Sequence, residues 1–378
     1  MLGLFYFTVL LLIGIYAVML LFFLSGWQQT PETQLQKGYT PQTKVCVIIP
    51  ARNEAIHLPK LLNDLKAQIF PPDLWELVVV DDHSTDDTPA IASAYEKVRL
   101  ISLADVMGNE KTVAYKKKAI ETAIQTTQAD WIITIDADVR VGPWWLHSLV
   151  QAIEEHKTKW IAAPVQFPKP TTWFQYFQLF DFLTMQGITA AVISTRSGVM
   201  CNGANLAYNR QAFHTVNGFE HINQLASGDD MLLMQKIDAR FPAQSLYLKQ
   251  AEAIATTEYM PNLPAFLQQR IRWASKAKHF NDKKIQAILL LVFLCNLLWI
   301  VLPMLCWMKI IPWLFFVGVM GFQLFIEWRL LQSVLQFFQQ RGSFLRFMLL
   351  KFLHVPYILV SGFWGMFGSY TWKDRTVQ

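Results

Sequence analysis

The segment "DWIITIDAD" (residues 130–138) joins a short apolar run to two acids at its end. Short runs of β-branched apolar residues are typical of buried strands. Two earlier segments have a similar composition: "VCVIIP" (45–50), which ends at a proline, and "WELVVVDD" (75–82), which also ends in acids. A further run, "VRLISL" (98–103), lies between "WELVVVDD" and "DWIITIDAD". The sequence therefore predicts four buried strands, three of which lead into polar or charged side chains.

Between these strands, apolar residues recur at the spacing of a helix. This spacing predicts helices at 55–68, near 87–97 and at 111–127. Strands that alternate with helices favour an α/β fold, built on a doubly wound and mostly parallel sheet.

The polar segments that follow the strands are "PARNE" (50–54), "DDHSTDD" (81–87) and "DAD" (136–138). Ligands of such sheets bind beyond the carboxyl ends of the strands, so we expect these segments to share one rim. One acidic turn would need no further explanation because Asp favours turns, but three on one rim favour a binding site. Asp136 and Asp138 are suited to Mg²⁺ or Mn²⁺, with a phosphate as the remaining ligand. The ion would neutralise charge on a departing diphosphate.

The segment "SGDDMLL" (227–233) allows two interpretations. Its acids lie at the start of a predicted helix, where Ser227 or Asp229 could act as the cap. Alternatively, one of the paired carboxylates could act as a general base that removes a proton from a hydroxyl group.

Two other segments carry candidate residues. "CNGANLAYNR" (201–210) contains Gly203 and Asn205, which suit a close approach of the backbone to a ligand. The lysines of "KKK" (116–118) fit a solvated helix face, although one of them could reach a phosphate from its place before the acidic strand.

Composition indicates a membrane protein. Apolar residues make up 53% of the 378 residues, and the mean hydropathy is +0.25. Four stretches lack charged side chains: 2–27, 285–308, 310–326 and 352–372. Each approaches the length that a helix needs to cross the hydrocarbon core. The expected organisation is a retained anchor (1–27), a linker (28–43), an α/β domain (44–262), an interfacial helix (263–284), three spans (285–372) and a tail (373–378).

Basic residues predict the orientation. The segment between the third and fourth spans carries Arg329, Arg341, Arg346 and Lys351, whereas the preceding loop carries only Lys309. Positive residues favour the cytoplasmic side, so the α/β domain is expected in the cytoplasm, at a bacterial inner or plasma membrane. The net charge of +5 fits a protein beside anionic lipid. No basic stripe predicts nucleic acid as a partner.

Six motifs occur in order: "IIPARNE", "VVVDDHSTDDT", "TIDADV", "CNGANLAY", "GDDMLL" and "QQRIRW". Their order and spacing resemble a membrane-bound family 2 glycosyltransferase with a GT-A fold, over roughly residues 44–280. The last motif has the form Q-x-x-R-W, with Gln269, Arg272 and Trp273.

The resemblance implies a role for each motif. Asp230 falls on the catalytic base, beside Asp229 where the family usually has glutamate. Gln269, Arg272 and Trp273 are expected to be catalytic together with Asp229 and Asp230, with Arg272 near the diphosphate and Trp273 beside the acceptor. Gly203, Asn205 and Trp273 are the residues expected on the acceptor side. The residues expected to bind the donor are Pro50, Ala51, Arg52, Glu54, Asp81, Asp82, Lys117, Asp136 and Asp138, and the last two would also bind the metal.

One position departs from the family. Tyr115 stands where glycine often precedes the lysine of the helix before the metal motif. The departure concerns the phosphate contact that the family pattern implies for Lys116 or Lys117, the two lysines that follow Tyr115.

The resemblance also implies an inverting transfer from a nucleotide-sugar, by family expectation a UDP-sugar. The expected acceptor is a membrane lipid, because four spans are few for an export channel. The alternatives are a processive synthase that extends and exports a glycan, with possible homo-oligomers or accessory subunits, and an inactive scaffold. The aromatic segment 173–193 is expected either at the interface or as a core helix, and residues 263–280 as a second interfacial helix.

Overall fold

The computed structural model describes residues 1–108, 112–225, 227–275, 283–367, 370–372 and 375–377. Two compact units make up the chain. The helical unit comprises Met1–Gln28, Lys169–Ala191 and Tyr259–Gln378, and the α/β unit comprises Gln29–Pro168 and Val192–Glu258. Part of the expected interfacial helix, residues 276–282, lies outside the described residues, as does Lys373 of the expected tail.

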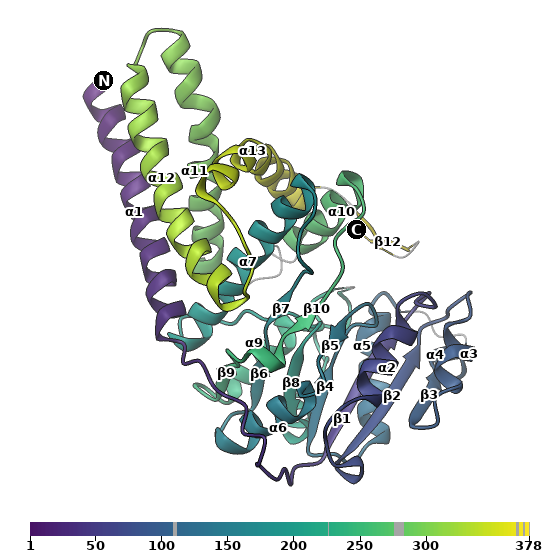
Figure 1. The fold of residues 1–378 in the computed structure, drawn as a ribbon. Coiled ribbons are helices and arrows are strands. Elements are labelled where there is room, and N and C mark those ends of the chain that lie inside the picture. The colour runs from purple at the N-terminus through teal and green to yellow at the C-terminus, as the bar shows by residue number, and fades with distance from the viewer. Residues whose placement is uncertain (109–111, 226, 276–282, 368–369, 373–374, 378) are drawn as a thin grey trace. The chain divides into compact units, whose positions relative to one another are not determined.

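The α/β unit contains a seven-stranded sheet with the order β3-β2-β1-β4-β8-β6-β9 (Figure 1). Its strands are β1 (Val45–Ala51), β2 (Trp75–Asp81), β3 (Val98–Ser102), β4 (Trp131–Thr134), β6 (Trp160–Ala162), β8 (Leu206–Asn209) and β9 (Ser245–Tyr247). β1 pairs in parallel with β2 and β4, β2 with β3, and β6 with β9. Only β8 runs antiparallel to its neighbours β4 and β6 in this sheet, within the described part of the chain. The expected α/β fold on a mostly parallel sheet is therefore confirmed.

Helices connect these strands, and the sequence predicts those at Leu58–Lys66, Thr88–Ser93, Tyr115–Thr126 and Met231–Arg240. The helices are α2 (Leu58–Lys66), α3 (Thr88–Ser93), α4 (Leu103–Met107), α5 (Tyr115–Thr126), α6 (Trp145–Glu155), α8 (Arg210–Thr215) and α9 (Met231–Arg240), with short 3-10 turns at Pro72–Leu74 and Ala251–Ala253. In α2 the leucines at helical spacing are all buried. α5 packs against β1 and β2. The Tyr115 ring in its first turn contacts the ring of His83, which follows β2.

Three short strands form a second, smaller sheet. It joins β5 (Arg140–Val141), β10 (Ala255–Thr256) and β7 (Val165–Gln166), with β10 in the middle. β10 brings the last residues of the α/β unit back to the segment that follows the acids of "DAD".

The helical unit consists of long apolar helices (Figure 1). They are α1 (Leu2–Gln29), α10 (Leu263–Ser275), α11 (Lys283–Trp307), α12 (Trp313–Phe337), α13 (Phe344–Phe367) and most of α7 (Trp173–Ser194). The two-stranded hairpin of β11 (Tyr370–Trp372) and β12 (Arg375–Val377) also belongs to this unit. Among the described residues, five helices are long and apolar enough to cross a membrane: α1, α7, α12 and the stretches Gln286–Trp307 and Phe344–Trp364.

Two observations favour four crossings, without α7. Strands on both sides of α7 in sequence pair in one sheet, since β4 precedes it and β8 follows it. One passage of α7 through a bilayer would separate these partners. In addition, α1 and α12 run in the same direction, because Tyr6 contacts Phe315, Tyr16 bonds to Glu327 and Trp27 contacts Phe337. The first and third of four successive crossings are parallel, whereas a crossing by α7 would make α1 and α12 antiparallel.

Three of the four basic residues expected in the loop between the last two spans lie within helices. The loop between α12 and α13 is shorter than expected, so Arg329 lies within α12, and Arg346 and Lys351 lie within α13. Lys351 is 2% exposed, and its Nζ donates to both carboxylate oxygens of Glu327 at 2.8 Å. Its charge is therefore balanced inside the helix bundle and does not contribute to the orientation argument, which rests on Arg329, Arg341 and Arg346.

Candidate active site

The ends of β1 and β2 bring "PARNE" and "DDHSTDD" together. Ala51 is in register with Asp81, and the Asp82 N–H donates to the Ala51 carbonyl at 2.8 Å. The Arg52 guanidinium donates to the Asp82 carbonyl at 3.0 Å, and the Glu54 N–H donates to Thr88 Oγ1 at 2.8 Å. These bonds join the two segments into one edge.

Asp81 has a buried oxygen at this edge. The side chain is 6% exposed, and its Oδ2 accepts from the Ser84 N–H at 3.3 Å. Its Oδ1 is buried and has no hydrogen-bond partner among the described residues. A buried acceptor without a donor is costly, so a ligand N–H or O–H at this place would stabilise the site.

Lys116, in the first turn of α5, joins two acidic segments. Its Nζ lies 2.8 Å from Asp136 Oδ1 and 2.9 Å from Asp229 Oδ2. Burial alone would lower the pKa of Lys116, but the carboxylates of Asp136 and Asp229 outweigh burial and raise that pKa well above its ordinary value. The ammonium is therefore a fixed positive charge between the end of β4 and the start of α9.

Gly203 allows this convergence. A Cβ atom at Gly203 would lie 3.3 Å from Asp229 Oδ2, 3.4 Å from Asp230 Cβ and 3.5 Å from Lys116 Nζ. The backbone before β8 thus lies directly against the acids, which fits the close approach that the sequence predicts for this glycine. Four motifs meet within one small volume of the α/β unit.

Asp230 is the N-cap of α9, and its Oδ1 accepts from the Met231 N–H at 2.7 Å. Capping by Ser227 or Asp229 was the other interpretation of this segment, and that choice of residue is wrong. The cap bond orients the Asp230 carboxylate at the helix start. A cap and a general base are compatible, because a carboxylate has a second oxygen and further lone pairs.

The acids of "DAD" lie in the turn that follows β4, with Ala137 buried between them. No group of three or more His, Cys, Asp or Glu side chains in the described residues is arranged to hold a metal. Two carboxylates are nevertheless sufficient for Mg²⁺, which usually keeps several waters and takes further oxygens from substrate phosphates. The oxygen donors of Asp136 and Asp138 fit that type of site.

Two candidate residues, Lys117 and Asn205, are buried and form hydrogen bonds within the protein. Lys117 is 1% exposed, and its Nζ donates to the carbonyls of Ile222, Leu225 and Ser227, each at 2.7 Å. These bonds hold the segment before Asp229, and the expected donor contact of Lys117 stays a prediction. The lysine that reaches the acidic rim is Lys116, one position earlier.

Asn205 is completely buried. Its amide donates to the carbonyls of Pro164 and Ala253 at 2.9 Å, and its Oδ1 accepts from Trp145 Nε1 at 3.0 Å. These bonds give Asn205 a structural role, since they join the segments of Pro164, Ala253 and Trp145. The expected acceptor-side contact of Asn205 stays a prediction.

The Q-x-x-R-W motif lies on α10 of the helical unit, and one residue inside it organises the rest. Arg270 Nη1 donates to Gln269 Oε1 at 2.7 Å, and the guanidinium stacks 4.2 Å from the centre of the Trp273 ring. Arg270 is 4% exposed and pairs with Asp181 of α7 at 2.8 Å, while Tyr357 of α13 donates to the same carboxylate at 2.9 Å. The motif helix is thus fastened to α7 and α13.

Sequence reasoning did not select Lys116 as the lysine that reaches the acidic rim, nor Arg270, Asp181 and Tyr357 as supports of the motif. The helix register of α5 contained a signal, because Lys116 and Lys117 point to different sides of a helix. The Arg270–Asp181 pair joins residues 89 positions apart, and no local pattern predicts it.

Residues 46–216 match the model of glycosyl transferase family 2. This segment contains the strand-end motifs, Lys116 and Gly203. The chain carries a family 2 glycosyltransferase domain.

The structure is similar to that of a mannosyltransferase, PcManGT, from Pyrobaculum calidifontis in complex with GDP-Man and Mn²⁺. The similarity covers 96% of this chain and 97% of PcManGT, with a TM-score of 0.54 and 17% identity. The similarity shows a shared GT-A fold.

Curated relatives match over shorter stretches. Glycosyltransferase AglE from Haloferax volcanii is 27% identical over 191 residues, which are 50% of this chain and 59% of AglE. Beta-monoglucosyldiacylglycerol synthase from Synechocystis sp. is 32% identical over 101 residues, 27% of this chain and 21% of the relative. The chain thus spans less than two thirds of the length of these relatives.

Proposed function

We propose that this glycosyltransferase moves a sugar from a nucleotide-sugar, a UDP-sugar by family expectation, to a hydroxyl group of a membrane lipid. The observation that carries the proposal is the convergence of Lys116, Asp136, Asp229 and Asp230 around Gly203. A structural helix cap alone would require only Asp230.

The donor would lie along the joined ends of β1 and β2. The unpaired Oδ1 of Asp81 would accept a hydrogen bond from the nucleoside, beside the segments of Pro50 to Glu54 and of Asp82. The diphosphate would then lie toward Asp136 and Asp138, where Lys116 supplies a fixed positive charge.

Asp136 and Asp138 would hold Mg²⁺ or Mn²⁺. When bound, such an ion supplies positive charge that neutralises the departing diphosphate. The Lys116 ammonium already lies 2.8 Å from Asp136, so it would act on the same developing charge.

Asp230 would serve as the general base. The acceptor oxygen forms a bond to the anomeric carbon while the bond from that carbon to the diphosphate oxygen breaks, and the hydroxyl proton passes to the Asp230 carboxylate. A single displacement of this kind inverts the anomeric configuration. Asp229 stays paired with Lys116, which keeps the neighbouring negative charge in place. Gln269, Arg272 and Trp273 are proposed to complete the site at the diphosphate and the acceptor.

A lipid acceptor is favoured by two observations. The four crossings that we infer from the five candidate helices provide little protein for an export channel, and a relative has the name of a glucosyldiacylglycerol synthase. We place the α/β unit on the cytoplasmic side of a bacterial plasma membrane, in agreement with Arg341 and Arg346 beside the loop between α12 and α13.

The test uses membranes that contain the protein, labelled UDP- and GDP-sugars, and separation of lipid extract from high-molecular-weight polymer. We expect label in the lipid extract with wild type and none with Asp230→Asn. Asp73→Asn is the matched control, because Asp73 is exposed in a 3-10 turn and should leave transfer unchanged. Label in polymer would replace the lipid acceptor by a growing glycan. Equal transfer by Asp230→Asn would refute the assignment of the base.

A further inference from the structure

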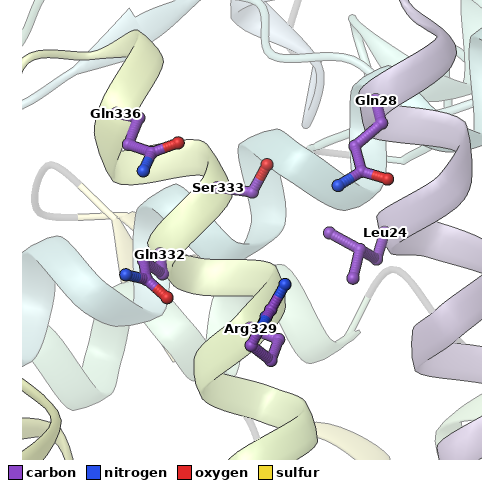
Figure 2. A pocket seen from close by; sticks show the side chains of 6 residues that line it. All are labelled: Leu24, Gln28, Arg329, Gln332, Ser333 and Gln336. Atoms are coloured by element: carbon purple, nitrogen blue, oxygen red, sulfur yellow. The ribbon is translucent and has the colours of Figure 1, made fainter.

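A polar groove lies between α1 and α12 within the helical unit (Figure 2). Its volume is about 250 Å³, and it is lined by Leu24, Gln28, Arg329, Gln332, Ser333 and Gln336. In Figure 2, Arg329 and Ser333 project from α12 toward the space that Gln28 and Leu24 reach from α1. The proposed glycosyl transfer uses none of these residues.

The residues of α12 form one stripe. Arg329, Gln332, Ser333 and Gln336 follow the spacing of three and four residues that places side chains on one helix face. The other face of the same turns is apolar and buried, with Leu330, Leu331, Val334 and Leu335 inside the bundle. The stripe is therefore a distinct polar surface on a helix that is otherwise apolar.

Arg329 supplies an uncompensated positive charge in this groove. No acidic residue lines the groove, and Arg329 has no ion pair among the described residues. The nearest acid in sequence, Glu327, already accepts from Lys351 at 2.8 Å, from Tyr16 at 2.9 Å and from Gln323 at 2.9 Å. Glu327 is thus balanced on the opposite side of the helix.

The groove lies where the apolar parts of both helices end. The apolar stretch of α1 ends at Trp27, just before Gln28, and the uncharged stretch of α12 ends just before Glu327. Since α1 and α12 run in the same direction, these ends face the same side of the membrane. Lipid headgroups occupy this level of a bilayer.

The chemistry of the groove selects a phosphate group. Arg329 offers a planar set of N–H donors that matches phosphate oxygens, and Gln28 and Ser333 add neutral donors at the same space. We propose that the groove binds the phosphate of a membrane phospholipid, with Leu24 against the lipid body. An arginine that only extended toward water would need no amide and hydroxyl groups around it.

The test is native mass spectrometry of the purified full chain, after exposure to mixed micelles that contain phosphatidylglycerol or dioleoylglycerol. We expect wild type to retain phosphatidylglycerol and not dioleoylglycerol, which lacks the phosphate. Arg329→Gln should reduce retention by roughly tenfold or more, because a charge-assisted hydrogen bond is lost. Arg341→Gln, the same substitution in the exposed loop after α12, should retain the lipid as wild type does.

A second variant removes donors but keeps the charge. Gln28→Leu combined with Ser333→Ala should weaken retention less than Arg329→Gln, so a folding defect of the arginine variant cannot decide the test alone. Equal loss in Arg329→Gln and Arg341→Gln, or unchanged retention in both, would overturn the proposal. Displacement of the lipid by excess inorganic phosphate would keep an anion site but overturn the lipid as its occupant.

Discussion

The acids of the α/β unit and those of the helical unit are compensated in opposite ways. At the rim of the sheet one cation, Lys116, serves two carboxylates, Asp136 and Asp229. In the helical unit one carboxylate, Asp181, receives both Arg270 and Tyr357. Charges that already have several partners hold helices together, whereas acids that share one cation can accept a further cation or a substrate. The difference separates a candidate site from a structural cluster.

The largest expected effect comes from the candidate base. Asp230→Asn keeps the shape of the side chain and removes its basicity, so transfer should fall by about 10²–10⁴-fold. The cap of α9 uses an oxygen that asparagine also has, and the melting temperature should therefore change little. Initial rates and thermal melting of the purified variant measure the two effects. A large loss of stability with normal transfer would reverse the roles assigned to the two clusters.

Breaking the helical cluster should act on stability. Arg270→Gln leaves the Asp181 carboxylate buried without its cation, which should lower stability by about 3–5 kcal/mol. Thermal melting in detergent would show the loss. Combining Arg270→Gln with Asp181→Asn removes both charges and should recover part of it. A double variant less stable than Arg270→Gln would contradict the compensation argument.

Removing the shared cation should affect the donor more than the fold. In Lys116→Gln the KM for the nucleotide-sugar should rise by roughly 10–100-fold, because a charged hydrogen-bond donor is lost beside the diphosphate. Lys118→Gln, two positions later on the same helix, is the control. Steady-state kinetics with varied donor concentration give the KM of Lys116→Gln and of Lys118→Gln. An unchanged KM in Lys116→Gln would contradict the prediction that Lys116 contributes to donor binding.

The smallest effect is expected at Asp86, which ties the two strand-end segments together. Its carboxylate accepts from the N–H groups of Thr88 and Ala55 at 3.0 and 3.1 Å. Burial would raise the pKa of Asp86, but the hydrogen bonds of Thr88 and Ala55 lower it below its ordinary value. A carboxyl with a lowered folded pKa stabilises above its unfolded pKa and loses that contribution as the pH falls through its folded pKa.

Asp86→Asn should therefore lower stability only slightly at neutral pH, by less than about 1 kcal/mol, because water screens this exposed carboxylate. The difference from wild type should shrink under acidic conditions. Melting curves over a range of pH give the comparison. A difference that grows on acidification would show that the carboxylate is not stabilised in this way.

Much of the α/β unit follows from local sequence patterns. β1, β2 and β3 begin and end within about a residue of the predicted runs, because a buried parallel strand needs a continuous apolar segment. β8 was not predicted. Its residues "LAYN" follow the glycine and asparagine of the preceding turn, and their pairing with β4 and β6 is a long-range contact.

The site was predictable as a set of motifs but not as a set of contacts. The order of strands places the acids at one rim, which parallel topology requires. Which lysine reaches them depends on the rotation of α5, and this gives the position to Lys116 while Lys117 binds three carbonyls beneath. The contacts of Asn205 were not predictable for the same reason, since its partners come from three distant segments.

The most direct test of the acidic rim is equilibrium binding of UDP and GDP to the purified chain, titrated with Mn²⁺ or with EDTA. The account predicts binding of at least one nucleotide with Mn²⁺, its loss in EDTA and in Asp138→Asn, and its retention in Asp73→Asn. Binding of the same strength in EDTA, or in Asp138→Asn with Mn²⁺, would contradict the proposal that these acids hold the metal and the donor diphosphate.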